Sequence, residues 1–388
     1  AYEIMPSLVG LGDVYKRQMQ YSLYMSNHRI IVMRGVMICV SLLLAVVSVE
    51  IGARIWTNSQ YHDALVLIPD IALHHRLIPD ITRTTVSAEW NRTVSINKLG
   101  MRGELPRSNV RTVLLLGDSF VYGWGVSDDE TIPVLLEKRL NEIMPDEEFQ
   151  VLNGGVPSYS PVLSNLQYKT TLRYLNPDIV IYVFDMSDVS DEVRYREFLI
   201  KDRYGDPVRV TNPYAMHQAL MSILGRSYIY QQLMRLLTRN GYPHELHNEK
   251  NDHWIGMRDN TEALAPNGWA SVQENLRLLR DYVREDGAEM LLTVVPRSPQ
   301  VDPEYLNKND RDHFGFPAAS VCCGEMFNVL GGIASELGIR YINPLNFFLE
   351  NKSRSLFYYY DGHLTNKGNS LMAEYMSHVL FEEIATSE

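Results

Sequence analysis

Five continuous apolar segments alternate with amphipathic segments from residue 110 onward, and this alternation constrains the fold more than any other feature of the chain. The apolar segments are residues 110–117, 149–155, 178–188, 289–296 and 340–344. Continuous apolar strands separated by helices are typical of a parallel sheet that is covered on both faces. We therefore predict a three-layer α/β/α sandwich with a parallel sheet of about five strands.

The segments between these strands carry apolar residues at helical spacing, which predicts the two outer layers. The predicted helices are residues 131–144, 161–175, 267–286, 321–338 and 365–384. Five strands with this number of helices indicate a doubly wound, flavodoxin-like fold. In such a fold, ligands bind outside the carboxyl ends of the strands.

The charge and cysteine content exclude several classes of protein. The 388 residues carry a net charge of −11, and the pI is near 5.5, which disfavours nucleic acid as a partner because phosphate binding needs clustered Lys and Arg. Cys39, Cys322 and Cys323 have neither the number nor the spacing of a disulfide framework or a zinc site. We expect no cofactor and no metal.

The N-terminal region predicts a membrane anchor. Residues 1–18 do not match the pattern of the remaining chain and resemble a non-native scar, so they are set aside from fold prediction. Residues 19–54 are interpreted as a signal anchor, since Gly35–Val49 carries no charge. Because Arg29 and Arg34 precede the apolar run, the N-terminus is expected in the cytoplasm and the remainder outside it, in the periplasm or extracellular space. A cleaved signal peptide is the alternative.

The remaining chain divides into a lead-in and one large domain. Residues 55–109 are predicted to be irregular with short extended pieces, and residues 110–388 form the α/β domain. Residues 192–266 interrupt the alternation with a predicted hairpin at 196–210 and a helix at 214–225. An insertion after a strand would lie over the same end of the sheet as a lid, where substrate specificity often resides.

Polar residues gather where these strands end. Gly117-Asp118-Ser119 follows the first strand, Asn153-Gly154-Gly155 the second, and Asp185–Asp188 the third, while Asp361 and His363 precede the final helix. Acyl-group chemistry needs a nucleophile, a base that takes its proton, and a group that orients the base. The alternatives are a helix-capping serine and a structural histidine.

Three blocks of sequence resemble the GDSL, or SGNH, hydrolase superfamily, and in particular its membrane-anchored bacterial members. They are Gly117-Asp118-Ser119-Phe120, Asn153-Gly154-Gly155-Val156-Pro157 and Asp361-Gly362-His363, within a resemblance that covers roughly residues 75–386. The resemblance implies that Ser119 is the nucleophile and His363 its base, oriented by Asp361. It also implies an oxyanion hole formed by the N–H groups of Ser119 and Gly155. Four further residues are expected around the pocket: Asp118, Asn153, Asp185 and Asp188.

Two blocks depart from the family pattern. The third block usually reads Gly-x-Asn-Asp, whereas this chain has Asp185-Met186-Ser187-Asp188, so Ser187 stands where an asparagine would donate to the oxyanion. Loss of one such donor costs about 3 kcal/mol of transition-state stabilisation. Asp185 adds a negative charge that would oppose an oxyanion unless it is paired. Asp361 lies two residues before His363, where the family commonly spaces the acid three residues before, at Tyr360.

These residues predict a serine ester hydrolase that acts through an acyl-enzyme. An ester substrate follows, either O-acetyl groups of an envelope polysaccharide or lipid esters. The alternatives are an O-acyltransferase that uses the same residues and a non-catalytic glycan-binding or assembly protein. Five other histidines lack the spacing of a metal site and are expected to be ordinary loop residues: His74, His75, His244, His247 and His253.

Overall fold

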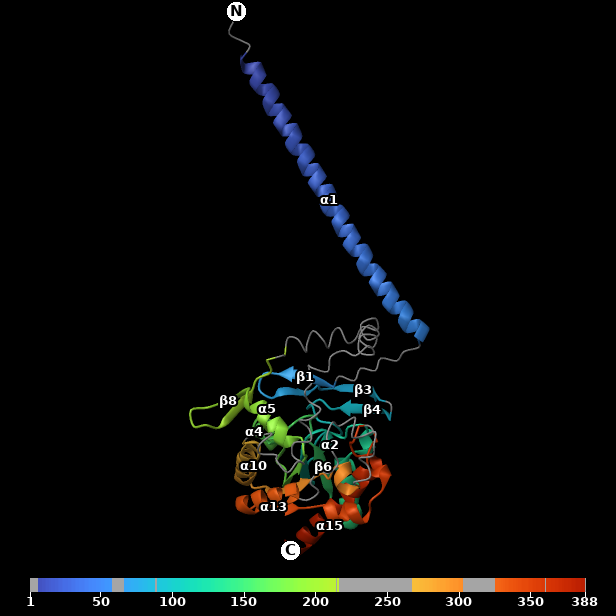
Figure 1. Cartoon of the computed structure of the whole chain (residues 1–388), viewed down its shortest axis with the longest axis vertical. Coiled ribbons are helices and arrows are strands. Elements are labelled where there is room, and N and C mark those ends of the chain that lie inside the picture. Colours follow the sequence, from blue (N-terminus) through green and yellow to red (C-terminus); the bar gives the residue numbers. More distant parts are fainter. Residues whose placement is uncertain are drawn as a thin grey trace, which may run out of the picture. The chain divides into compact units, whose positions relative to one another are not determined.

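The computed structural model describes residues 6–57, 66–87, 89–213, 215, 267–302, 325–359 and 361–387 (Figure 1). Most of the predicted lid lies outside the described residues, including nearly all of the predicted helix at 214–225. So do Cys322, Cys323 and the three histidines between 244 and 253. The described chain forms two units, helix α1 and the domain that begins after it.

Helix α1 is Pro6–Thr57, a single helix of 52 residues. It contains Arg29–Gly52, a stretch of 24 residues that includes an 18-residue window with a mean hydropathy of 2.7, long and apolar enough to cross a membrane. The helix begins inside the segment that the sequence analysis sets aside, so residues 6–18 are helical.

The domain contains a five-stranded parallel sheet in the order β11-β10-β7-β5-β6. Its strands are β5 (Arg111–Gly117), β6 (Phe149–Asn153), β7 (Ile179–Phe184), β10 (Glu289–Val294) and β11 (Arg340–Ile342). All five coincide with the apolar segments of the sequence, and every residue of β6 and β7 is buried. The predicted three-layer fold is confirmed.

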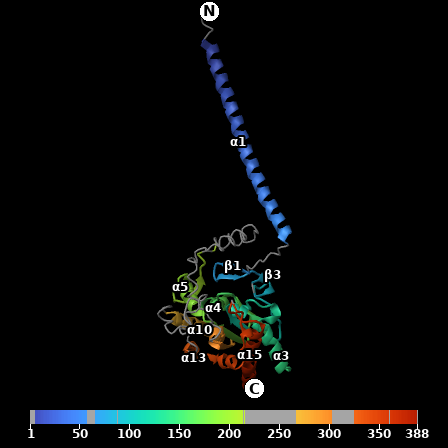
Figure 2. The same cartoon turned by 45° about the vertical axis from the view of Figure 1, so that its right-hand side comes forward.

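Alternate residues of each strand face opposite helix layers. One face packs against α4 (Pro161–Thr170), α10 (Gly268–Glu285) and α13 (Glu325–Leu337), and the other against α3 (Ile132–Ile143) and α15 (Asn366–Ser387). Figure 2 shows α10 and α13 on one side of the domain and α3 on the other.

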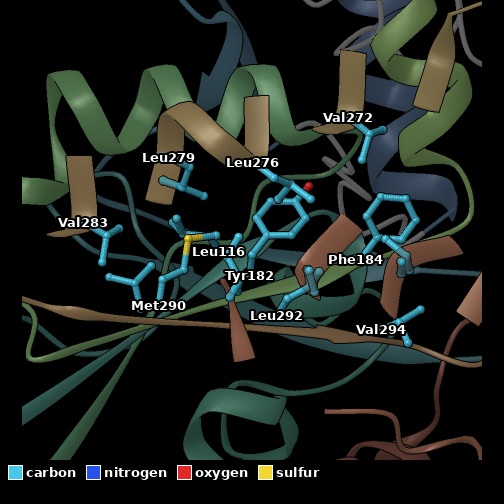
Figure 3. Packing of buried hydrophobic residues seen from close by; sticks show 14 of the residues in the cluster. Leu116, Tyr182, Phe184, Val272, Leu276, Leu279, Val283, Met290, Leu292 and Val294 are labelled. Atoms are coloured by element: carbon cyan, nitrogen blue, oxygen red, sulfur yellow. The ribbon is translucent and has the colours of Figure 1, made fainter. Parts of the chain in front are cut away.

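The packing against α10 shows why this segment is helical. Leu276 and Leu279 of α10, three residues apart, reach the sheet together and meet Tyr182 of β7 and Leu292 of β10 (Figure 3). Burial of each such side chain contributes about 1.5–3 kcal/mol to the free energy of unfolding.

The lead-in is more regular than the sequence predicts. It forms two antiparallel hairpins, β1 (Leu67–Asp70) with β2 (His74–Leu77) and β3 (Ile81–Val86) with β4 (Asn91–Ile96). Val94 and Ile96 of β4 belong to the same buried cluster as Tyr122. The lead-in therefore packs beside the end of β5.

The segment after β7 begins with α5 (Asp188–Arg196). The hairpin predicted at 196–210 is confirmed as β8 (Leu199–Lys201) and β9 (Pro207–Val210). The remaining short helices are α2 (Ser119–Tyr122), α11 (Ser298–Val301) and α14 (Leu345–Glu350), with 3₁₀ turns at Asp128–Glu130, Leu172–Leu175 and Arg354–Leu356.

Candidate active site

Ser119 is the first residue of α2, at the carboxyl end of strand β5. Asp118 precedes it and caps the short helix: its Oδ1 accepts from the Phe120 N–H at 2.9 Å, and its Oδ2 lies 3.2 Å from the Ser119 hydroxyl oxygen. The first N–H groups of a helix have no intrahelical acceptor, so the Ser119 N–H is of the kind that can donate to a ligand.

The end of β6 is hydrogen-bonded to α2 and packs closely against it. Nδ2 of Asn153 donates to the Val121 carbonyl at 2.9 Å, and its Oδ1 accepts from the Gly155 N–H at 3.0 Å. A Cβ atom on Gly155 would lie 2.3 Å from the backbone nitrogen of Tyr122, a distance that no side chain tolerates. Asn153 and Gly155 therefore act on the position of Ser119 through close backbone packing.

The structure brings Ser119, His363 and Asp361 into one chain of hydrogen bonds. Ser119 Oγ lies 2.8 Å from Nε2 of His363, and Nδ1 of the same ring is hydrogen-bonded to Oδ1 of Asp361. A carboxylate at Nδ1 favours the tautomer in which Nδ1 is protonated, which leaves Nε2 able to accept the serine proton. The arrangement suits nucleophilic attack by Ser119 on a carbonyl carbon.

These three residues share a pocket of about 320 Å³. Its other lining residues are Asp118, Trp124, Pro157, Ser158, Ser187, Asp191 and Arg297. Among the predicted site residues, Asp118 and Ser187 thus reach the pocket. Asn153, Asp185 and Asp188 are buried beside it and act through their hydrogen bonds.

The loop that carries Asp361 is held by the lead-in. The two carboxylate oxygens of Glu89 accept from the N–H groups of Tyr359 at 2.7 Å and Asp361 at 3.0 Å. Burial raises the pKa of Asp361. Its hydrogen bond with His363, the charge of that ring and a hydrogen bond with Trp124 lower the pKa by more, so the pKa of Asp361 lies below its ordinary value. Asp361 is therefore a carboxylate at neutral pH.

The end of β7 explains the departure at the third block. The Ser187 hydroxyl donates to Oδ2 of Asp185 at 2.5 Å, and the Ser187 N–H donates to the same oxygen at 3.1 Å. The Ser187 hydroxyl thus has a carboxylate acceptor in this structure, as the Gly155 N–H has the Asn153 side chain. Two of the three expected oxyanion donors are engaged within the protein.

Arg297 is the site residue that the sequence analysis misses. It follows the carboxyl end of β10, and its Nε and Nη2 donate to Asp185 at 2.7 and 2.5 Å. Burial raises the pKa of Asp185, but the charge and hydrogen bonds of Arg297 lower it below its ordinary value. The negative charge at Asp185 is therefore paired. The sequence feature that could have indicated Arg297 as a site residue is its position directly after the apolar segment 289–296.

Asp188 is buried beside Asp185. Its Oδ2 accepts from the Tyr182 hydroxyl at 2.9 Å and from the Asp185 N–H at 3.2 Å. Burial, followed by the charges of Asp118 and Asp185, raises the pKa of Asp188 well above the ordinary value. This shift favours the protonated form of Asp188 and so opposes a second negative charge beside Asp185.

Within the described part of the chain, no group of three or more His, Cys, Asp or Glu side chains could hold a metal ion. His74 and His75 contact one another through their Nδ1 atoms at 2.9 Å, and Nε2 of His75 contacts the Pro157 carbonyl at 2.8 Å. Burial lowers the pKa of each to about 4, so both rings are neutral at pH 7 and belong to the packing of the lead-in.

Asp118 makes the stability of the domain depend on pH. Burial and then the charge of Asp185 raise its pKa from 3.8 to about 6. Between pH 4 and pH 6 the folded protein therefore holds a proton that the unfolded chain releases, so this group's contribution to the free energy of unfolding falls as the pH rises.

We expect Asp118→Asn to raise the melting temperature relative to wild type by roughly 2–6 °C more at pH 8 than at pH 5, since only at pH 8 does wild type bury the charge. The amide oxygen can still cap the Phe120 N–H, so the helix start is preserved. Thermal unfolding of both proteins at the two pH values measures the difference. A difference that does not vary with pH would contradict the raised pKa.

Comparison with known proteins returns solved structures only, since no family model and no curated protein matches the chain. A lipolytic protein of the G-D-S-L family from Desulfitobacterium hafniense has 12% identity and a TM-score of 0.37, covering 69% of this chain and 99% of that one. An acetylxylan esterase from Geobacillus stearothermophilus has 11% identity and a TM-score of 0.38, covering 70% and 94%. The esterase EstA from Pseudoalteromonas sp. has 12% identity and a TM-score of 0.37, covering 71% and 99%.

Proposed function

We propose that this protein is a serine ester hydrolase that acts through an acyl-enzyme. The observation that carries the proposal is the continuous hydrogen-bonded path from Ser119 Oγ through the His363 ring to Asp361, at the wall of a pocket. A serine that only capped α2 would need no histidine at 2.8 Å, because Asp118 already caps that helix.

The reaction follows from the direction of these hydrogen bonds. Ser119 Oγ attacks the ester carbonyl carbon while its proton passes to Nε2 of His363, and the carbonyl electron pair moves onto oxygen. The imidazolium, stabilised by Asp361, then gives that proton to the leaving alkoxide as the C–O bond breaks. Water repeats the sequence on the acyl-enzyme, releasing the acid and restoring Ser119.

A membrane location is part of the proposal. Arg29–Gly52 has the length and hydropathy of a membrane span. Arg29 and Arg34 at its N-terminal end favour a cytoplasmic N-terminus, and the proposed site of action of the domain is therefore the other side of the membrane. An enzyme held there would meet envelope polysaccharides and lipids, so their O-acyl groups are the proposed substrates. A sugar hydroxyl in place of water would make the same site an acyltransferase.

Covalent labelling tests the proposal. We expect a fluorophosphonate probe to modify the wild-type protein at Ser119, as located by peptide mass spectrometry, and to leave Ser119→Ala unmodified. Wild type should also hydrolyse 4-nitrophenyl acetate. Ser158→Ala is a matched control, because Ser158 lines the same pocket but is not the serine that is hydrogen-bonded to His363.

A folded wild-type protein that neither reacts with the probe nor hydrolyses the ester would contradict the proposal. It would favour the non-catalytic binding protein instead. If the protein is active, adding a polysaccharide acceptor and analysing the products separates hydrolysis from acyl transfer.

A further inference from the structure

We propose that Arg297 replaces the missing asparagine of the third block, so that its guanidinium stabilises the oxyanion formed on the substrate. This inference rests on the proposed function and adds a residue to its machinery. Arg297 lines the pocket that contains Ser119 and His363, and its side chain is only 10% exposed.

The guanidinium lies beside the position from which the asparagine would donate. Nη2 of Arg297 and Oγ of Ser187 each contact Oδ2 of Asp185 at 2.5 Å, so these two donor atoms are at most 5 Å apart. Ser187 occupies the asparagine position in sequence. The Ser187 hydroxyl is directed to Asp185, and Arg297, which pairs with the same carboxylate, brings its guanidinium to the same part of the pocket.

The guanidinium also lies close to the reacting groups. Its carbon Cζ stands 4.6 Å from the centre of the Phe120 ring, and that ring is 4.7 Å from the His363 ring. Phe120 directly follows Ser119 in α2. Arg297 and His363 therefore both lie against the ring of Phe120, the residue next to Ser119.

Two features fix Arg297 in one orientation. The paired hydrogen bonds to Asp185 hold the planar guanidinium from one edge, and the Phe120 ring covers a face. A donor held before the reaction starts pays no reorganisation cost when the negative charge develops. Asp185, which would oppose an oxyanion if it were unpaired, becomes the residue that positions the cation.

Loss of one partner of a buried ion pair destabilises a protein by itself, so the melting temperature of each variant is measured beside its activity. We compare Asp185→Asn, which keeps the cation without its carboxylate partner, with the double variant Asp185→Asn/Arg297→Gln, which removes both charges. On neutral 4-nitrophenyl acetate, we expect the double variant to lose about 100-fold in kcat, with KM within about threefold of wild type. For Asp185→Asn alone we expect a loss in kcat of about tenfold or smaller.

Two further variants separate catalysis from structure. Adding Ser187→Asn to the double variant restores the amide donor and should recover about tenfold in kcat. Arg173→Gln removes a comparable arginine–aspartate pair, in which Arg173 contacts Asp286 at 3.1 and 2.5 Å outside the pocket, and should leave kcat unchanged. If the double variant melts below the assay temperature, Arg297→Lys takes its place with an expected loss of about tenfold in kcat.

Several results would overturn the inference. Equal losses in Asp185→Asn and the double variant would mean that Arg297 only holds Asp185. A rise in KM confined to a 4-nitrophenyl ester whose acyl chain ends in a carboxylate would make Arg297 a binding group for anionic substrates. Full Ser119-dependent hydrolysis in the double variant overturns this inference alone. A wild type without Ser119-dependent hydrolysis overturns the proposed function as well.

Discussion

Replacement of His363 by glutamine is expected to lower kcat for 4-nitrophenyl acetate by roughly four to six orders of magnitude. Nε2 of His363 is 2.8 Å from Ser119 Oγ, and an amide nitrogen cannot take the proton that the serine must lose. Fluorophosphonate labelling should slow in parallel, because it needs the same activated hydroxyl.

A matched histidine is available as a control for this variant. His378 is exposed on α15, and His378→Gln should retain wild-type kcat. His363 stands at the pocket with its ring against Phe120, so the melting temperature of His363→Gln should stay within a few degrees of wild type. More than about 1% of wild-type kcat in folded His363→Gln would exclude His363 as the general base.

The sheet was predictable because its strands are buried on both faces. Such strands read as unbroken apolar runs, and each of β5, β6, β7, β10 and β11 has one. The ends of these apolar runs also predicted where the active site lies, because parallel strands bring their carboxyl ends to one edge of the sheet. Ser119 and the end of β7 were therefore expected near one another from the strand pattern alone.

The lead-in hairpins were harder to predict. Strands β1 to β4 are four to six residues long and expose much of their surface, with a burial pattern in β4 that leaves only Val94 and Ile96 fully covered. Short, half-exposed strands carry little periodic signal. These hairpins hold the Asp361 loop through Glu89. This residue lies in the loop between β3 and β4, and its carboxylate accepts hydrogen bonds from the backbone of the Asp361 loop, some 270 residues later in the sequence.

The charge balance of the pocket could not be read from one segment. From the sequence alone, the charge of Asp185 was expected to be unfavourable for an oxyanion, because its partner Arg297 lies 112 residues later in the chain, just after β10. Strand order places β10 directly beside β7, and only that adjacency allows Arg297 to meet Asp185. Two short blocks of sequence were thus enough to predict Ser119, His363 and Asp361, whereas the residues that position them and balance their charges depend on the packing of the sheet.

The second large effect is expected at Asp361. Asp361→Asn should lower kcat by about 10⁴-fold, because an amide that donates to Nδ1 of His363 stabilises the tautomer whose Nε2 is already protonated. Since the pKa of Asp361 lies below its ordinary value, its carboxylate stays charged across the neutral and mildly acidic range. The loss should therefore be similar at pH 6 and pH 8.

Glu89→Gln provides the matched comparison, because it removes a carboxylate whose two oxygens accept from the backbone of the Asp361 loop. The amide oxygen of the glutamine can still accept a hydrogen bond from one of the two N–H groups. The loop should therefore loosen without losing the hydrogen bonds that join Ser119, His363 and Asp361. We expect a loss in kcat of about tenfold, measured with the same ester. If Glu89→Gln and Asp361→Asn lose activity equally, the carboxylate of Asp361 acts by holding the loop and not by setting the tautomer of His363.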